Sequence, residues 1–485
     1  MSPRGEPLTY RRRMLVLGIC CLSLLLIGID MTVVNIALPT IEHDLRAGVS
    51  ELQWTIDAYT VLLASLLMFA GSTGDRLGRR RVFQTGLAVF TLASLACGLA
   101  PNVGCLIAFR AVQGIGASML NPVSLSIVRT VFTDDRERAR ALGVWAGVFG
   151  LSMALGPLVG GLLIGLGLGW RAVFWMNIPF GLAGLILTAR FVPESRAGHP
   201  RRPDPLGQLL VITLLATLTV GIIEGPRSGW TSPVVLACLV LAVAALAGVL
   251  GYEPGRTEPL LEVRLFRSLP LSGAAITCCL AFAAFGGFLW VNTLYLQDVR
   301  GYSALHAGLL TMPMALVTAL IGPPSGRLVA RHGPRPALVV SGVTIALSSL
   351  LLVPLVPGTA TGWLITSYAI FGLGFGMVSA PTNMTALAGM PPAQAGVAAS
   401  ITSTSRQVGQ TLGVAIAGSI VAAGLHGAAP AAELTNASHP VWWLLVAFGV
   451  AIVCLAILST GARAQRTAEE TAARLTAGRN SRSSA

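Results

Sequence analysis

Residues 71–81 read GSTGDRLGRRR, and this polar, arginine-rich stretch joins two apolar runs near 52–71 and 82–100. A helix needs roughly 20 mostly apolar residues to cross a bilayer, because every backbone N–H and C=O must be satisfied within the segment. Each flanking run has about that length. The stretch is therefore expected to be a short loop between two membrane-spanning helices.

The rest of the chain repeats this pattern of long apolar runs and short polar loops. Of its 485 residues, 54% are hydrophobic and only 11% are charged, whereas a soluble protein carries roughly a quarter charged residues. We predict an all-α integral membrane protein with fourteen transmembrane helices. The runs lie near 14–38, 52–71, 82–100, 103–128, 141–166, 172–192, 205–225, 232–252, 270–297, 305–325, 337–356, 361–389, 395–424 and 440–462.

The placement of the arginines predicts the orientation of these helices. The chain has no lysine, so its 33 basic residues are all arginine. With the N-terminus in the cytoplasm, 25 of them fall in cytoplasmic segments and 4 in outside loops, which is the excess that cytoplasmic loops normally carry. The same pattern accounts for the net charge of +13 without a nucleic-acid partner. Absent lysine with abundant Ala, Gly, Pro and Arg is typical of a high-G+C bacterial genome, so we expect the bacterial inner (cytoplasmic) membrane, with both termini cytoplasmic.

The opening stretch has a counterpart in the second half of the chain. Residues 326–336 read GRLVARHGPRP, and both stretches follow the second run of a group of six. Parallel six-helix repeats around a site at the bilayer midplane are a transporter architecture. The positions shared by the two stretches are Gly71/Gly326, Arg76/Arg331, Gly78/Gly333 and Arg80/Arg335.

This repeat divides the chain into five predicted segments. A first six-helix block (14–192) and a second one (270–463) flank a linker (193–269) that contains two extra transmembrane helices. A cytoplasmic N-terminus (1–13) precedes them. A cytoplasmic tail (464–485) follows, and we expect it to be helical to about Leu475 and disordered beyond.

Several motifs resemble those of a known family. GSTGDRLGRRR at 71–81 resembles the loop motif of the major facilitator superfamily. DMTVVNIALP at 30–39, RAVQGIG at 110–116 and GPLVGG at 156–161 resemble motifs of its fourteen-helix drug:proton antiporter branch, and GWRAVFWMNIP at 169–179 is a lesser match. The resemblance covers nearly the whole chain. It implies the major facilitator fold, two six-helix bundles plus two inserted helices, and export of drugs in exchange for protons.

Charged residues inside the apolar runs are the first candidates for function. Such a charge costs at least roughly 2.5–3.5 kcal/mol at the centre of a transmembrane helix, so it usually faces a cavity or a partner. We predict that Asp30, Asp57 and Arg110 couple transport to protons. The alternatives are a static polar contact for Asp30, a solvated position near the outer surface for Asp57, and an ion pair needed for folding for Arg110. Glu224 and Asp298 are expected at the membrane interface.

The loop at 71–81 is predicted to act as a gate. Its glycines permit a tight turn and a close helix approach, and Asp75 can cap a helix N-terminus or pair with an arginine. In the resembled family this loop latches the outward-facing state. The second loop has Ala330 at the position of Asp75, so the gate is asymmetric. The gate residues are Gly71, Gly74, Asp75, Arg76, Gly78, Arg79 and Arg80.

The fifth run combines small residues with a proline. Gly156, Pro157, Gly160 and Gly161 predict either close packing alone or a bendable interface across which the two halves rock. The resemblance associates this pattern with antiporters.

Three further polar residues, Asn35, Gln113 and Arg406, are candidates for a central cavity. The resemblance places Gln113 beside Arg110 in a motif implicated in proton transfer. For Arg406, a side chain that extends to the membrane surface is an equally open alternative.

No cofactor or metal site is predicted. The eight cysteines show no CxxC pair, the six histidines show no i, i+4 pair, and the chain contains no Walker sequence that would point to ATP. With no nucleophile–base constellation and no sizeable soluble domain, the chain is predicted not to be an enzyme.

The predicted function is proton-coupled secondary export, by alternating access, of amphipathic, cationic drugs or toxic small molecules. The expected partners are the drug-like substrate, protons and the lipid bilayer. The sequence gives no oligomeric state, and a monomer is consistent with it. A dedicated exporter of a single metabolite, such as a self-made antibiotic, and proton-coupled uptake are the alternatives.

Overall fold

The computed structural model describes residues 9–196, 204–256, 263–388, 395–425 and 431–483. These residues form helices joined by short connections, with no strand among them. In the described residues, thirteen helical spans are long and apolar enough to cross a bilayer, with α6–α7 and α13–α14 each counted as one span. Helix α5 carries a further, shorter apolar stretch, Leu151–Gly165. The prediction of an all-α membrane protein is confirmed.

The N-terminal helices follow the first six predicted runs, with one interruption. Predicted run 172–192 is divided into α6 and α7, with Met176 between them. Pro179, the third residue of α7, has no N–H to donate to the preceding turn, so the backbone ladder is broken there. The bounds are α1 Tyr10–Leu45, α2 Val49–Leu77, α3 Arg79–Gly98, α4 Val103–Val131, α5 Asp135–Gly165, α6 Ala172–Trp175 and α7 Asn177–Phe191.

The remaining helices show a second interruption of the same kind. Predicted run 361–389 is divided into α13 and α14, and Pro381 is again the third residue of the second piece. The bounds are α8 Pro205–Ser228, α9 Pro233–Tyr252, α10 Leu269–Leu294, α11 Ala304–His332, α12 Pro334–Leu352, α13 Thr361–Gly376, α14 Ser379–Leu387, α15 Ala395–Gly424, α16 Ala431–Ser459 and α17 Ala462–Ser483. Two short 3₁₀ helices lie at Glu253–Gly255 (η1) and Val263–Arg267 (η2), and a short π-helix, Tyr295–Val299 (η3), follows α10.

Helix α17 corrects the expectation for the tail. The sequence predicts helix to about Leu475, whereas the structure continues it to Ser483. The stretch is rich in Ala and Arg, which favour helix over coil. Thr467 Oγ1 accepts a hydrogen bond from Leu269 N (3.1 Å), so the first turns of α17 dock at the start of α10.

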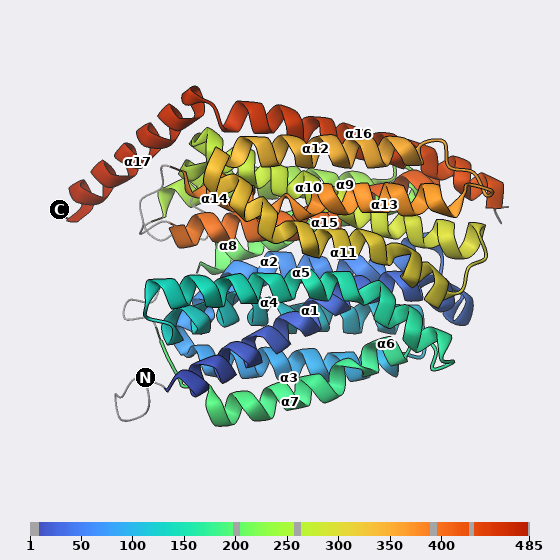
Figure 1. Ribbon diagram of the computed structural model, residues 1–485, viewed down its shortest axis with the longest axis horizontal. Helices are drawn as coiled ribbons and strands as arrows, with labels where there is room; N and C mark the ends of the chain where they lie inside the picture. The colour runs from blue at the N-terminus through green and yellow to red at the C-terminus, as the bar shows by residue number, and fades with distance from the viewer. Residues whose placement is uncertain (1–8, 197–203, 257–262, 389–394, 426–430, 484–485) are drawn as a thin grey trace.

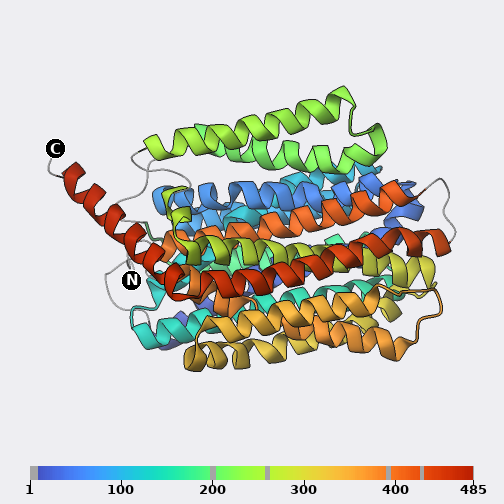
Figure 2. The same ribbon diagram turned by 90° about the horizontal axis from the view of Figure 1, so that it is seen from above.

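The long helices run side by side in two groups (Figure 1). Within α1–α7, α1 packs against α5, and α4 packs against α2 and α3. Within α10–α16, α10 packs against α15, α12 against α16, and α11 against α13. Figure 2 shows the α8–α9 pair along one flank of the bundle, where α8 lies against both α2 and α15.

The two groups meet along α5–α11 and α2–α15. Between them, the described residues form hydrogen bonds from Gln53 Nε2 to Ala415 O and from Gln297 Nε2 to Ile36 O, each 3.0 Å. Both bonds lie at the end of the bundle remote from the 71–81 loop. The groups also share one apolar core, in which Val33 of α1 belongs with Phe285 of α10.

Candidate functional site

A buried ion pair lies between α1 and α4. Arg110 Nη1 donates to Asp30 Oδ2 at 2.6 Å, and the side chains of Asp30 and Arg110 are 0% and 1% exposed. Two of the three residues predicted for proton coupling are therefore in direct contact. An Arg–carboxylate hydrogen bond is among the stronger polar contacts in proteins because both partners are charged.

The second oxygen of Asp30 is held by two amides. Gln113 Nε2 and Asn177 Nδ2 each donate to Asp30 Oδ1 at 2.9 Å. Gln113 Nε2 also donates to Ser94 Oγ (2.8 Å), and Gln113 Oε1 accepts from Arg110 Nη1 (2.7 Å). Helices α1, α3, α4 and α7 thus meet in one network around a single carboxylate.

Aromatic rings and a backbone carbonyl surround the guanidinium of Arg110. Its Cζ lies 4.3 Å from the Tyr59 ring centroid and 5.7 Å from that of Phe174, and Arg110 Nε donates to Thr55 O at 3.0 Å. Cation–π contacts of this kind gain strength when the cation is desolvated. The cation is therefore stabilised by more than the carboxylate alone.

This arrangement suits a group that binds and releases a proton. Every polar partner of Asp30 among the described residues donates a hydrogen bond to it, and one of them is the cationic Arg110. Adding a proton to Asp30 would leave Arg110 with an uncompensated charge in a buried site, which is costly. The protonation state of one carboxylate is thereby linked to the packing of four helices.

Sequence reasoning missed Asn177, Ser94 and Tyr59. Asn177 lies in GWRAVFWMNIP as an amide within an otherwise apolar run, and that isolated polar residue is the signal that could have found it. Ser94 and Tyr59 carry no comparable signal, since serine and tyrosine are common in transmembrane helices. Their place in the network depends on how α2 and α3 pack against α4.

Asp57 lies apart from this network. Its side chain is 0% exposed, so the solvated position near the surface that the sequence left open is not what the structure shows. Thr60 Oγ1 donates to Asp57 Oδ1 at 3.3 Å, and Asp57 Oδ2 has no partner among the described residues.

The other two cavity candidates also lie outside the Asp30 network. Asn35 is buried on α1, where its Nδ2 donates to Thr32 O one turn earlier (3.4 Å). Arg406 is half-buried on α15, and its Nη2 donates to Ser403 Oγ (2.7 Å). Among the described residues, Arg406 has no carboxylate partner.

Residues 71–81 are not the loop that the sequence predicts, because α2 continues to Leu77 and α3 begins at Arg79. The chain turns at Gly78 alone, the one residue of the stretch outside a helix, where φ is positive. Asp75 Oδ1 accepts from Arg79 Nη2 (2.7 Å) and Nε (3.0 Å), and Arg79 Nη1 donates to Thr130 Oγ1 of α4. Gly74 lies against Val123, where an added Cβ would come within 2.9 Å of Cγ2. The predicted gate residues thus connect the ends of α2, α3 and α4, while no hydrogen bond or ion pair appears for Arg76 in the described contacts.

Glu194, which the sequence did not single out, completes this turn. Gly78 has φ +116°, and an added Cβ would lie 2.7 Å from the Glu194 carboxylate. Glu194 Oε1 accepts from Arg80 N at 3.1 Å, and Arg79 N donates to Ser195 O at 2.9 Å. The segment after α7 therefore supplies acceptors for the first N–H groups of α3, which have no partner within that helix.

The glycines of α5 serve two interfaces. An added Cβ at Gly156 would clash with Thr32 of α1, and one at Gly160 would come within 2.9 Å of Val33. On the other side, a Cβ at Gly161 would come within 2.9 Å of Leu305 Cα on α11. A Cβ at Gly308 of α11 would lie 2.5 Å from Pro157 O. Helix α5 is thus packed at backbone distance between α1 and α11.

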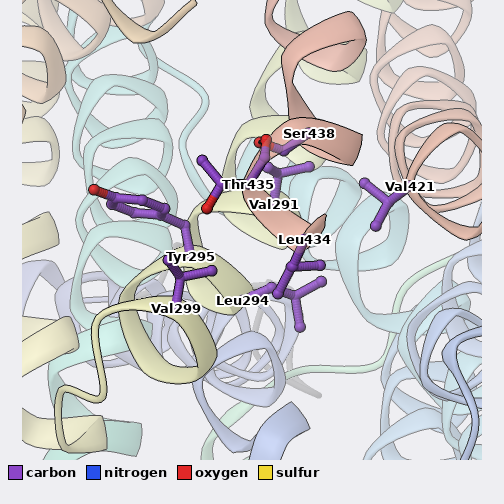
Figure 3. A pocket seen from close by; sticks show the side chains of 8 residues that line it. All are labelled: Val291, Leu294, Tyr295, Val299, Val421, Leu434, Thr435 and Ser438. Atoms are coloured by element: carbon purple, nitrogen blue, oxygen red, sulfur yellow. Dashed lines mark hydrogen bonds between the residues drawn. The ribbon is translucent and has the colours of Figure 1, made fainter. Parts of the chain in front are cut away.

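A small pocket lies in the second group of helices, at the end remote from the 71–81 loop (Figure 3). It is lined mainly by apolar side chains from α10, η3, α15 and α16. Tyr295 turns its hydroxyl away from the other labelled side chains and donates to Val356 O at 2.7 Å. None of the predicted site residues lines it, and we assign it no substrate. The lining residues are Val291, Leu294, Tyr295, Val299, Val421, Leu434, Thr435 and Ser438.

Comparison with known proteins identifies the family. The family model "Major Facilitator Superfamily" matches residues 20–414. The chain is 35% identical to "Multidrug resistance protein Stp" of Mycobacterium tuberculosis (86% of this chain, 77% of that one). It is 35% identical to the "Tetracenomycin C resistance and export protein" of Streptomyces glaucescens (82% and 74%) and 33% identical to "Multidrug efflux pump LfrA" of Mycolicibacterium smegmatis (86% and 83%). The chain is therefore a multi-pass membrane protein that belongs to the Major Facilitator Superfamily, a family of transporters.

Proposed function

We propose that this protein exports amphipathic, cationic small molecules in exchange for protons that move inward. The names of its relatives, two multidrug proteins and one antibiotic export protein, support drug export. The observation that carries proton coupling is the fully buried Asp30–Arg110 pair with its two amide donors.

In this proposal Asp30 alternates between two states. In the ionised state Asp30 is paired with Arg110 and held by Gln113 and Asn177, and the contacts of these side chains support this assignment. When protonated, it no longer neutralises Arg110, so the packing of α1 against α4 becomes less favourable. The protonated and ionised states of Asp30 therefore favour the inward-facing and outward-facing conformations to different extents. A proton can shift the equilibrium between these conformations only through such a difference in free energy.

The helix contacts support an alternating-access movement of two six-helix blocks, 14–192 and 270–463, with the segment 193–269 between them. The blocks contact each other most closely where Gly161 of α5 meets α11 and Gln53 of α2 meets α15. In this proposal the 71–81 loop and both termini lie on the cytoplasmic side of a bacterial inner membrane. The contact between the two blocks is at the opposite end, so it closes the protein toward the outside. The Asp75–Arg79 turn then lies at the cytoplasmic end of the first block, where we propose that it latches the outward-facing state.

The proton gradient supplies enough free energy for this export. A potential of 100 mV contributes about 2.3 kcal/mol per charge, which supports nearly a fiftyfold concentration gradient at about 1.4 kcal/mol per decade. One proton exchanged for one monovalent cation moves no net charge and gains nothing from the potential. Two protons per cation would use it, and we propose that Asp57 carries the second.

The test is efflux of a fluorescent cation from inverted or reconstituted vesicles under an imposed pH gradient. Asp30→Asn is expected to reduce proton-driven efflux at least about tenfold, since it removes a group that binds the coupling proton. Glu470→Gln, an acid exposed on α17, is the matched control and should leave efflux unchanged. Unimpaired proton-driven efflux in the Asp30→Asn protein would contradict the proposal. Movement of the fluorescent cation toward the cytoplasmic side of the protein, together with protons, would instead identify proton-coupled uptake.

A dedicated exporter of a single metabolite is the second candidate, because one relative is named for tetracenomycin C. A resistance panel across chemically unrelated toxins separates the two. Protection against several classes would support a broad pump, whereas protection against one class would support a dedicated exporter. The resistance panel does not test the role of Asp30, which the vesicle assay measures separately.

A further inference from the structure

The two faces of α2 lie in different environments. Thr55 and Tyr59 contact Arg110 of α4, through the Thr55 carbonyl and the Tyr59 ring. At 3.6 residues per turn, a residue two positions from each of them lies on the opposite side of the helix. Asp57 is that residue, so its carboxyl points away from the Asp30–Arg110 network.

The face that carries Asp57 packs against the second block and the inserted helix pair. Gln53, one turn before Asp57, donates to Ala415 O of α15. Val61, one turn after it, belongs to an apolar cluster with Leu215 of α8 and Val408 of α15. Asp57 therefore lies between two contacts of a three-helix interface, which we name the α2–α8–α15 seam.

Helix α8 is hydrogen-bonded to both other members of this seam. Gln208 Nε2 donates to Ser65 O (2.7 Å) near one end of the seam, and Trp54 Nε1 donates to Glu224 Oε1 (3.4 Å) near the other. Ser419 Oγ of α15 donates to Ile222 O of α8 at 2.5 Å. The inserted helix thus forms a third wall that separates Asp57 from the surrounding bilayer.

Among the side chains that the structure describes, no charged group on these helices pairs with Asp57. Arg110 is on the opposite face of α2, Arg406 of α15 is bonded to Ser403, and Glu224 of α8 is bonded to Trp54. A buried carboxylate with one oxygen unpaired is far more costly when it is ionised than when it is the neutral acid. The closed seam therefore requires the neutral, protonated acid at this position.

We propose that Asp57 is a proton-operated latch of the α2–α8–α15 seam, at a site separate from Asp30. When the seam is open, the carboxylate takes a proton from the medium at that end of the molecule, and the seam then closes over it. The closed seam separates the proton from that medium, so the proton moves with the conformational change. This proposal rests on the proposed function in one respect, because it takes the opening of the seam to be a step of transport.

Disulfide formation across the seam tests the latch without a transport assay. An added Cβ at Gly418 would lie 2.7 Å from Gln53 Cγ, so Gln53→Cys with Gly418→Cys brings two Cβ atoms near the 3.5–4.5 Å that a disulfide needs. The pair is introduced into a chain whose native cysteines are replaced and which retains efflux. The cross-linking rate is then measured from pH 5 to pH 9, with and without Asp57→Asn.

At each pH, the cross-linking rate of the Asp57 protein is divided by that of the Asp57→Asn protein. This ratio removes the pH dependence of the thiols, which is the same in both proteins. With Asp57 present, we expect the closed fraction to fall by up to about tenfold per pH unit above the titration point of the carboxyl, since one proton is linked to closure. Asp57→Asn, which is permanently neutral, should cross-link at the fast rate at every pH. Asp57→Glu keeps an acid and should keep the pH dependence, which separates loss of the acid from misfolding.

A rate ratio that stays constant across the pH range would overturn the latch. Asp30→Asn in the same background separates this outcome from failure of the proposed function. It should reduce proton-driven efflux at least about tenfold, as above, yet keep pH-dependent cross-linking at the seam. Loss of the pH dependence in the Asp30→Asn protein would show one proton site instead of two and would also overturn the inference.

Discussion

At the scale of single residues, Asp30 and Arg110 illustrate how a buried charge is tolerated in a membrane helix. The pair contributes no net charge, and two amides and two aromatic rings surround it. Removing one member of a buried pair typically costs roughly 3–5 kcal/mol, because the other charge is left uncompensated. The pair is thus a structural element as well as a proposed proton site.

Arg110→Gln is therefore expected to lower thermal stability in detergent markedly, by about 3 kcal/mol or more. The double variant Asp30→Asn/Arg110→Gln, which removes both charges, should recover much of the stability without recovering proton-driven efflux. Arg406→Gln is the matched control, since Arg406 has no carboxylate partner among the described residues, and it should change stability far less. Equal losses in the single and double variants would contradict a coupled pair.

Gly78 gives a second prediction at this scale. Its φ of +116° and its closeness to Glu194 leave no room for a side chain, and a backbone in this region costs a non-glycine residue about 1–3 kcal/mol. Gly78→Ala should lower the melting temperature. Gly71→Ala, whose Cβ would make an ordinary 3.5 Å contact with Pro122, should leave it nearly unchanged. The opposite order would show that the turn adapts to a Cβ.

At the scale of secondary-structure elements, α5 has two packing surfaces with different consequences. Gly156 and Gly160 bring it against α1 within its own block, whereas Gly161 brings it against α11 of the other block. A contact within one block contributes to stability in every conformation. A contact between blocks exists only while that end of the molecule is closed, so it affects the equilibrium between conformations.

Substitutions on these two surfaces should therefore have different effects. Gly156→Ala is expected to lower thermal stability, because its Cβ would overlap Thr32. Gly161→Ala should affect stability less but slow the Gln53→Cys/Gly418→Cys cross-link, because it separates α5 from α11. Gly147→Ala, on the exposed side of the same helix, is the control for both measurements. An unchanged cross-linking rate in the Gly161→Ala protein would contradict the role of this contact in closure.

Helix breaks were harder to predict than helices. The sequence predicts the apolar runs 172–192 and 361–389 as continuous, yet each is interrupted three or four residues before a proline, Pro179 and Pro381. Hydropathy averages over about 20 residues and is insensitive to one missing N–H. The prolines were visible in the sequence and mark both interruptions.

At the scale of the whole molecule, the two proposed proton sites predict how export depends on voltage. If Asp30 and Asp57 each carry a proton, export of a monovalent cation moves one net charge and responds to the membrane potential. With Asp57→Asn, proton-driven export should continue on a pH gradient but lose its response to an imposed potential in reconstituted vesicles. An unchanged response would show that the proton on Asp57 does not cross the membrane.

The sequence by itself determined the fold class and the family. Long apolar runs must become helices in a bilayer, because no other local structure satisfies their backbone groups without water. Motifs such as GSTGDRLGRRR depend on near neighbours along the chain, as the Asp75–Arg79 contact one helical turn apart shows. Both properties are local, so they can be read without knowing how the helices pack.

The tertiary structure decided how the buried polar residues are grouped. The sequence predicts Asp30, Asp57 and Arg110 as one set, yet only Arg110 contacts Asp30. Asp57 lies on α2 between Gln53, which contacts α15, and Val61, which packs with α8 and α15. Asn177 and Glu194 join their sites from more than 100 positions away in sequence. Which face of a helix meets which neighbour depends on the packing of the whole bundle, and that packing separates one proposed proton site into two.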